Sequence, residues 1–215
     1  MKSSDLIKHL TESGLMPQEE TLELPRSEKN LFIGIPRETA LQENRVALVP
    51  DSVGLLVNNG HRVLIESKAG EPANFTDKDY SEAGAEIVSD AKDVYRANII
   101  IKVAPPTLEE VAMFDPMQKQ ILFSALQITS QPKDCMKQLM KQKVTCVAYD
   151  FIKDRDGVYP IVRSMSEIAG NTSILIAAEC LSNVNGGHGV MMGGIPGVKP
   201  TKVVILGAGG VGEFA

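Results

Sequence analysis

The 215-residue sequence carries 22 basic and 27 acidic residues, for a net charge of −5, and 43% of its residues are hydrophobic. This composition is typical of a globular protein of one or two domains. The charges are mixed along the sequence without a basic stripe, which argues against nucleic acid as a partner because nothing would release counterions from a phosphate backbone.

Cysteine usage and hydropathy favour a cytoplasmic location. The three cysteines, Cys135, Cys146 and Cys180, are odd in number and widely spaced, which is typical of reduced thiols rather than a disulfide framework. No stretch approaches the roughly 20 apolar residues of a membrane span, and the polar N-terminus lacks the apolar core of a signal peptide. We therefore expect a cytoplasmic protein without direct membrane insertion.

The first segment in chain order, residues 1–30, has little capacity to form a core. A short amphipathic stretch with Leu6, Ile7 and Leu10 is followed by prolines and many Glu and Ser residues. This pattern predicts a helical N-terminal arm.

Residues 31–165 alternate short β-branched runs with charged amphipathic segments, which predicts strands and helices in turn. Helix start signals stand at Pro50-Asp51, at Ser89-Asp90 and at Thr107–Glu110, the last with capping-box spacing. Because parallel strands need long crossovers, this order favours an α/β domain with a Rossmann-like, doubly wound, mostly parallel sheet. The predicted strands are LFIGI (31–35), HRVLIE (61–66), AEIV (85–88), NIIIKV (98–103), QILFSA (120–125) and VTCVAY (144–149).

Residues 166–215 are predicted to be a linker helix and the start of a second Rossmann domain. The run Ser166–Asn183 is apolar on most faces in its second half, which predicts a buried helix. A glycine-dense stretch follows, and then a predicted strand, Val203–Leu206. We expect this dinucleotide-binding domain to be cut off just past the turn that follows the strand.

That turn reads GAGGVG, with glycines at Gly207, Gly209, Gly210 and Gly212. Glycines at this spacing, between a strand and a helix, allow the backbone to approach a pyrophosphate. The pattern predicts dinucleotide binding, with an incidental strand-to-helix turn as the alternative. The acidic residue about 20 positions further on, which separates NAD from NADP, would lie beyond Ala215.

Arg45 follows the first predicted strand and is a candidate for binding a carboxylate. Ligands of open α/β sheets bind beyond the carboxyl ends of the strands, and a guanidinium can hold a carboxylate with two parallel hydrogen bonds. The alternative is a surface arginine paired with Glu43, and spacing alone does not decide between them.

Lys102 interrupts the apolar run 98–106, where a buried strand would carry another β-branched residue. A buried ammonium is costly without a partner. We therefore expect Lys102 at the edge of the sheet, in a salt bridge, or against an anionic substrate.

Other titratable residues fit structural positions. The adjacent carboxylates Glu109 and Glu110 are predicted to be a solvated helix start. His9, His61 and His188 are predicted to be ordinary surface residues. Histidines and cysteines lack the spacing of metal ligands, so we expect no metal site.

Five motifs in order resemble the alanine dehydrogenase and proton-translocating transhydrogenase α-subunit family. They are IGIPRETALQENRVALVP, GHRVLIESKAGEPANFTDKDYSEAGAEIV, NIIIKVAPP, YPIVRSMSEIAGNTS and GGIPGVKPTKVVILGAGGVG. The resemblance covers about Leu31 to Ala215 and is closest to alanine dehydrogenase.

The resemblance implies two Rossmann-like domains with a substrate cleft between them, and it makes residues 31–165 the substrate-binding domain. It implies that Arg45 and Lys102 bind the substrate carboxylate, and that Ser166 and the glycines of the 207–212 turn contact the cofactor NAD. An alanine dehydrogenase interconverts L-alanine with pyruvate and ammonia by hydride transfer. We also expect a homo-oligomer.

One departure concerns the catalytic position. Members of the family usually have an acid/base histidine in a pattern like FxxLH, where this sequence has Gln127. A glutamine hydrogen-bonds but transfers no proton at neutral pH. Two alternatives therefore stay open: the nucleotide-binding component of a transhydrogenase, and a catalytically silent homologue. The 215-residue chain by itself is expected to be inactive.

Overall fold

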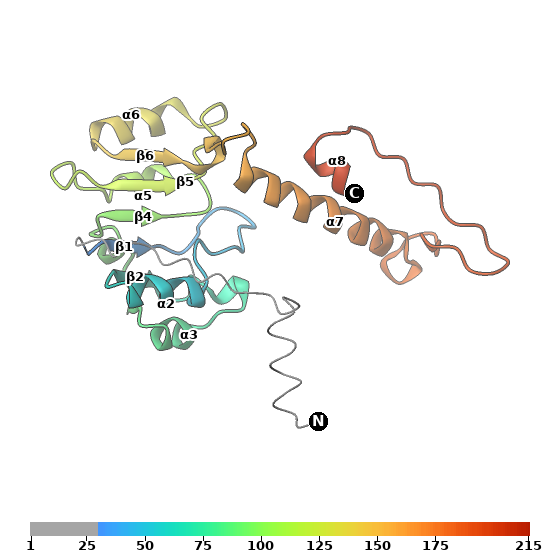
Figure 1. The fold of residues 1–215 in the computed structure, drawn as a ribbon, viewed down its shortest axis with the longest axis horizontal. Helices are drawn as coiled ribbons and strands as arrows, with labels where there is room; N and C mark the ends of the chain where they lie inside the picture. Colours follow the sequence, from blue (N-terminus) through green and yellow to red (C-terminus); the bar gives the residue numbers. More distant parts are fainter. Residues whose placement is uncertain (1–29) are drawn as a thin grey trace, which may run out of the picture. The chain divides into compact units, whose positions relative to one another are not determined.

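A parallel sheet of six strands organises the residues that the structure, a computed structural model, describes, which are 30–215 (Figure 1). The arm predicted before Leu31 lies outside them. The strand order is β3-β2-β1-β4-β5-β6 and every ladder is parallel, which confirms the doubly wound prediction. The strands are β1 (Phe32–Ile35), β2 (Arg62–Glu66), β3 (Glu86–Val88), β4 (Ile99–Ile101), β5 (Ile121–Ser124) and β6 (Thr145–Ala148).

Helices fill the connections between the strands, as the alternating pattern predicts. They are α2 (Pro50–Asn58), the 3-10 helix η1 (Glu71–Ala73), α3 (Asp77–Glu82), α4 (Ala91–Val94), α5 (Leu108–Val111), α6 (Lys133–Lys141) and the 3-10 helix η2 (Tyr149–Phe151). Asp90 caps α4, and Thr107 forms the predicted capping box with Glu110 at the start of α5. A second capping box, between Thr76 and Asp79, starts α3.

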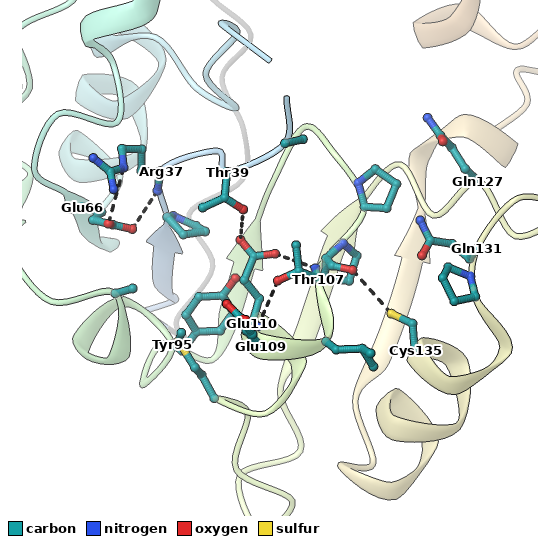
Figure 2. Close-up of a pocket in the computed structure, with 18 residues that line it drawn as sticks. Arg37, Thr39, Glu66, Tyr95, Thr107, Glu109, Glu110, Gln127, Gln131 and Cys135 are labelled. Carbon is teal, nitrogen blue, oxygen red and sulfur yellow. Dashed lines mark hydrogen bonds and ion pairs between the residues drawn. The ribbon is translucent and has the colours of Figure 1, made fainter. Parts of the chain in front are cut away.

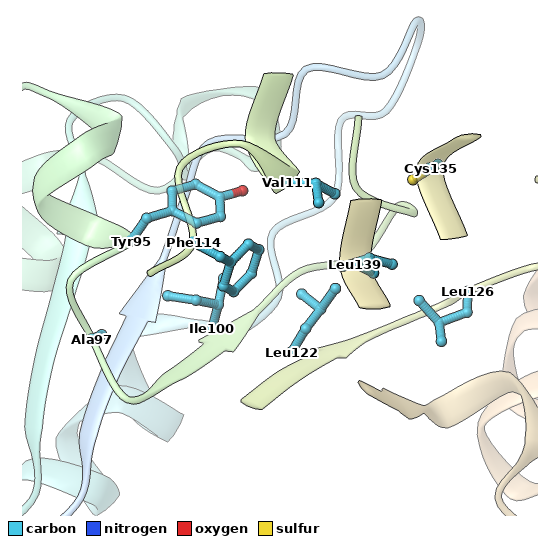
Figure 3. Close-up of a cluster of buried hydrophobic side chains, with 9 residues drawn as sticks. All are labelled: Tyr95, Ala97, Ile100, Val111, Phe114, Leu122, Leu126, Cys135 and Leu139. Carbon is cyan, nitrogen blue, oxygen red and sulfur yellow. The ribbon is translucent and has the colours of Figure 1, made fainter. Parts of the chain in front are cut away.

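On one face of the sheet, side chains from α5, from α6 and from the segment just after α4 pack against the strands (Figure 3). Ile100 of β4 and Leu122 of β5 are fully buried there. Cys135 and Leu139 lie four residues apart on α6, so both point at these strands. The side chains of this core cluster are Tyr95, Ala97, Ile100, Val111, Phe114, Leu122, Leu126, Cys135 and Leu139.

The opposite face is covered by α2 and α3. Ile33 and Ile35 of β1 alternate with Gly34 and therefore point to the same side. They pack with Val53 of α2 and with Tyr80 of α3. Tyr80 is completely buried, and its hydroxyl donates a hydrogen bond to the Leu48 carbonyl, 2.9 Å away. Two cores on two faces fix the strand register and hold the carboxyl ends of the strands in place.

The helix that follows β6 differs from its prediction. The helix α7 spans Pro160–Leu181, starting six residues before Ser166, and Gly170 is its one buried residue. Ile168 and Leu175 are about 70% exposed. The buried position predicted for this helix is therefore wrong within residues 30–215, since few described residues pack against its apolar side chains. The domain boundary placed at 165/166 stays a prediction.

The chain after α7 forms the 3-10 helix η3 (Asn183–Asn185) and the short helix α8 (Gly210–Phe214). The strand predicted at Val203–Leu206 is wrong: no ladder forms there in the described part of the chain. Its apolar side chains are exposed, because a lone extended segment has no neighbouring strand to pair with. Among residues 30–215, no helix has both the length and the apolar character needed to cross a membrane.

Candidate functional site

The strand order reverses between β1 and β4, and this point is where open α/β sheets bind ligands, beyond the carboxyl ends of the strands. Lys102 is the first residue after β4. The segment from Pro36 to Arg45 follows β1 directly. Two of the predicted site residues therefore leave neighbouring strands at the same edge of the sheet.

Lys102 is almost completely buried and lies in a salt bridge, one of the three predicted outcomes. Its Nζ is 3.2 Å from Glu38 Oε2 and 2.8 Å from Glu110 Oε1, and the exposed fractions of the three side chains are 1%, 4% and 7%. The interpretation of Glu110 as a solvated helix start is wrong. Burial of the ammonium made a nearby carboxylate necessary, and Glu110 supplies one.

Both carboxylates are also bound by other donors. Glu38 accepts hydrogen bonds from the backbone N–H groups of Val103, at 2.6 Å, and Ala104, at 3.3 Å. Glu110 accepts from the Thr107 N–H at 2.7 Å and from the Thr39 hydroxyl at 3.3 Å (Figure 2). These bonds tie the loop after β1 and the first turn of α5 to the end of β4. Glu38 thus anchors the backbone just after β4, and Glu110 anchors the start of α5.

Arg45 is paired with Glu43, as the surface alternative predicts. Arg45 Nε lies 2.8 Å from Glu43 Oε1, and Nη2 lies 2.6 Å from Oε2. These hydrogen bonds lower the pKa of the Glu43 carboxyl and raise that of the Arg45 guanidinium. The third nitrogen, Nη1, lies 3.6 Å from the sulfur of Met165 on α7. The ion pair with Glu43 thus uses Nε and Nη2 of the guanidinium, whereas Nη1 contacts Met165.

A cavity of about 250 Å³ brings Arg45 and Lys102 together. Tyr149, at the end of β6, also lines it, and burial raises the pKa of its hydroxyl, which donates to the Val103 carbonyl. Two basic residues and a tyrosine thus line the cavity, and its other lining residues are apolar. Its lining residues are Arg45, Val46, Ala47, Ile101, Lys102, Val103, Phe123, Tyr149, Ile161 and Met165.

Gln127 lies at a different cavity, of about 830 Å³, which Glu110 also lines (Figure 2). The carboxylate of Asp150 accepts from the backbone N–H groups of Leu126, at 3.2 Å, and Gln127, at 3.1 Å, and so holds this loop. Gln127 has a backbone φ of 43°. The structure therefore does not bring Gln127 into the cavity of Arg45 and Lys102.

The glycine turn lies against Ser166, since a Cβ at Gly210 would lie 3.1 Å from the Ser166 Cβ; that both contact the cofactor stays a prediction. Ser166 and the turn line one cavity of about 560 Å³. Gly207 has φ +110°, a conformation that favours glycine, and a Cβ at Gly212 would clash with the Gly207 carbonyl oxygen. A Cβ at Gly209 would meet nothing within 4 Å, so one side of the turn is open. This open backbone cradle fits a pyrophosphate.

Family models match nearly all of the described residues. The model described as alanine dehydrogenase/PNT, N-terminal domain, matches residues 34–169, and the C-terminal domain model matches residues 173–215. The chain belongs to the alanine dehydrogenase/PNT family. The resemblance of the five sequence motifs is thereby confirmed.

Alanine dehydrogenases of two organisms are similar to this family member. The protein of Methanococcus maripaludis is 43% identical over 186 residues, which are 86% of this chain and 49% of the relative. Alanine dehydrogenase 2 of Staphylococcus aureus is 42% identical over 183 residues, 85% of this chain and 48% of the relative. The chain spans about half the length of the curated relatives it matches.

Two solved structures share the fold of this family member. An L-alanine dehydrogenase superposes with a TM-score of 0.77 at 42% identity, over 84% of this chain and 49% of that one. A transhydrogenase from Sinorhizobium meliloti superposes with a TM-score of 0.62 at 23% identity, over 69% of this chain and 44% of that one. The second likeness shows the fold alone.

Sequence reasoning missed Glu38, Glu110 and Tyr149 as residues of the site. The signal for the two glutamates was indirect, because Lys102 in an apolar run required a partner but did not identify it. The cysteines of the described residues are free, and burial raises the pKa of the Cys135 and Cys146 thiols, as expected for structural positions, whereas Cys180 is exposed.

Proposed function

We propose that this family member is part of an NAD-dependent alanine dehydrogenase, which converts L-alanine, NAD and water to pyruvate, ammonia and NADH. The observation that carries the proposal is the cavity in which Arg45 and Lys102 meet at the switch point of the sheet. The relatives at 42–43% identity bear the name alanine dehydrogenase.

The cavity suits a small keto acid. Its volume of about 250 Å³ is below the range of about 300–1,000 Å³ for drug-sized ligands. Arg45 would bind the carboxylate of pyruvate or L-alanine, and Lys102 would donate a hydrogen bond to a substrate oxygen. The apolar side chains of Ile101 and Phe123 would contact the methyl group and exclude water from it.

The glycine turn is proposed to bind the cofactor. Gly207, Gly209, Gly210 and Gly212 would hold the pyrophosphate of NAD through backbone N–H groups, with Ser166 beside them. When bound, NAD supplies the hydride acceptor. A Gly212→Ala variant would test the cradle, because its Cβ would clash with the Gly207 carbonyl and weaken NADH binding measured by fluorescence.

Gln127 would act by hydrogen bonding, because an amide transfers no proton. Its side chain lines the larger cavity, so we assign it to the surroundings of the site and not to the substrate contacts. The transhydrogenase alternative is less favoured, since its support from solved structures is a likeness of fold at 23% identity.

The test uses the product of the complete reading frame. Given pyruvate, ammonia and NADH, it should oxidise NADH, and omission of ammonia should abolish the reaction. Replacement of pyruvate by a second nicotinamide dinucleotide distinguishes a transhydrogenase. No turnover with intact NADH binding would refute the dehydrogenase and support the silent homologue.

Location and assembly belong to the same proposal. We place the protein in the cytoplasm, which is supported by cysteines that are free in the described part of the chain. We expect a homo-oligomer, which light scattering of the purified protein would measure.

A further inference from the structure

Lys102, Glu38 and Glu110 form a buried cluster with more carboxylates than it needs for neutrality. With all three groups ionised, two carboxylates and one ammonium leave a formal charge of −1. Their side chains are at most 7% exposed. A buried charge is costly unless it is paired and hydrogen-bonded, so a single carboxylate would satisfy the lysine at lower cost. Neutralisation of the lysine therefore does not explain the second carboxylate.

The two carboxylates approach the ammonium from separate parts of the fold. Glu38 belongs to the loop after β1 and is fixed by the backbone that follows β4. Glu110 belongs to α5 and is fixed by the capping box of that helix. Because both are anchored independently, they determine the direction of two of the N–H bonds of Lys102.

The third N–H bond of Lys102 remains available. An ammonium has three protons, and within residues 30–215 its Nζ donates to Glu38 and Glu110 alone. Lys102 is also one of the residues that line the 250 Å³ cavity that Arg45 lines. A ligand oxygen in that cavity would be an acceptor for this donor.

The other charged and titratable groups around the cavity do not replace the two glutamates. Arg45 is neutralised by Glu43, to which it donates two side-chain hydrogen bonds. Tyr149 is neutral at physiological pH, because burial raises the pKa of its hydroxyl above the ordinary value of 10.0. Glu38 and Glu110 are the carboxylates in contact with Lys102 in the described chain.

We propose that Glu38 and Glu110 are positioning residues, which hold the buried ammonium of Lys102 in place and direct its remaining N–H bond to the substrate. This rests on the proposed function, in which the substrate is a keto acid bound by Arg45 and Lys102. The two glutamates act through the lysine and contact no substrate. Loss of either carboxylate removes one of the two acceptors that fix this direction.

The first test is Glu110→Gln in the complete protein. A glutamine at this position preserves the size of the side chain and can still complete the capping box, so the main loss is charge. The KM for pyruvate should rise about tenfold or more while kcat changes less than about threefold, the mark of lost substrate binding.

Glu109→Gln is the matched control, since Glu109 is the neighbouring glutamate on α5, is exposed, and makes no ion pair with Lys102. It should leave the KM for pyruvate unchanged. Glu38→Gln should behave as Glu110→Gln does. Unchanged KM for pyruvate in both folded variants would overturn the proposal, and so would an equal change in the control.

A second measurement separates this proposal from the proposed function. NMR of the isotope-labelled lysine side chains, with the Lys102 signal assigned by its absence in Lys102→Arg, reports the hydrogen bonds of the Lys102 ammonium without any substrate. The ammonium protons of Lys102 should exchange with water faster in Glu110→Gln than in the unaltered protein, because one of the two carboxylate acceptors is lost. An unaltered protein without turnover would refute the dehydrogenase, whereas an unchanged exchange rate of the Lys102 protons would refute the positioning role.

Discussion

At the scale of single residues, the cations of the site are already paired before any substrate is considered. Arg45 has Glu43, and Lys102 has Glu38 and Glu110. The pairs differ in their surroundings: the Arg45 side chain is 56% exposed and that of Lys102 is 1% exposed. Solvent weakens the first pair, whereas the second depends on its partners.

The first prediction concerns Glu43→Gln. The hydrogen bonds from Arg45 lower the pKa of the Glu43 carboxyl in the folded protein. The pair therefore stabilises the fold fully at pH values above 4.5, the ordinary pKa of the carboxyl, and this stabilisation is lost as the pH falls through the lowered pKa. At pH 7 the substitution should lower the free energy of unfolding by less than about 1 kcal/mol, because the arginine is exposed.

Urea unfolding of both proteins from pH 7 down to pH 3 measures this difference. It should shrink as the pH falls, since a protonated Glu43 no longer forms the ion pair. A difference that stays constant over the whole range would show that the contribution of Glu43 is not electrostatic.

The second prediction concerns Gln127→His. An acid/base group contributes a factor of about 100 to 10,000 to a rate where it reaches the reacting atoms. Gln127 lines the larger cavity and not that of Arg45 and Lys102. We therefore expect kcat for pyruvate amination to change less than about threefold, because a new imidazole there lies outside the substrate contacts.

Steady-state kinetics over pH 5–9 provide the measurement, with Gln131→His on the same cavity as the control. A hundredfold gain confined to Gln127→His, with a new dependence on an ionisation near the histidine pKa of about 6.5, would contradict the expectation. That result would favour the silent homologue.

At the scale of elements, α5 is only four residues long but holds Glu110 in place. The third prediction is that Thr107→Ala destabilises the protein by about 1 kcal/mol through loss of the capping hydrogen bond. Because the cap also fixes Glu110, this substitution should raise the KM for pyruvate as well. Thermal unfolding and steady-state kinetics measure the two effects.

Thr76→Ala is the control for that prediction, since Thr76 forms the same kind of capping box at α3, which contributes no side chain to the site. It should reduce stability by a similar amount and leave KM unchanged. Equal changes of KM in both variants would attribute the effect to general loosening of the fold.

The sequence predicted the six strands because β-branched runs bounded by turn residues are a strong local signal. It missed α3 and α6. The helix α3 starts with a capping box in which Asp79 stands at the third position, and α6 starts after Pro132. The strand predicted at Val203–Leu206 failed because a strand exists by pairing, which depends on neighbours and not on local propensity.

For the site, the sequence indicated Arg45 and Lys102, and the structure places both on one cavity. Their role in binding stays a prediction, as do those of Gln127 and Ser166. Glu38 was out of reach, because 64 residues separate it from Lys102 and no sequence pattern identifies such a long-range partner. A lysine in an apolar run predicts that a carboxylate lies nearby but does not identify its position in the sequence.

At the scale of the whole molecule, the carboxyl ends of β1 and β4 depend on the cores that cover the two faces of the sheet. The fourth prediction tests this with Leu122→Ala. Leu122 is fully buried between β5 and the helices α5 and α6, so its truncation leaves a cavity and should cost about 2–5 kcal/mol. That is a large part of the roughly 5–15 kcal/mol by which domains are stable.

Leu55→Ala is the matched control, because Leu55 of α2 is 61% exposed and the same atoms removed there should cost less than about 1 kcal/mol. Urea unfolding gives both values. Since Lys102 follows β4, which pairs directly with β5, the Leu122 variant should also weaken pyruvate binding before it unfolds. Loss of stability without any change in pyruvate affinity would show that the site is held by its own buried cluster and not by the core beneath it.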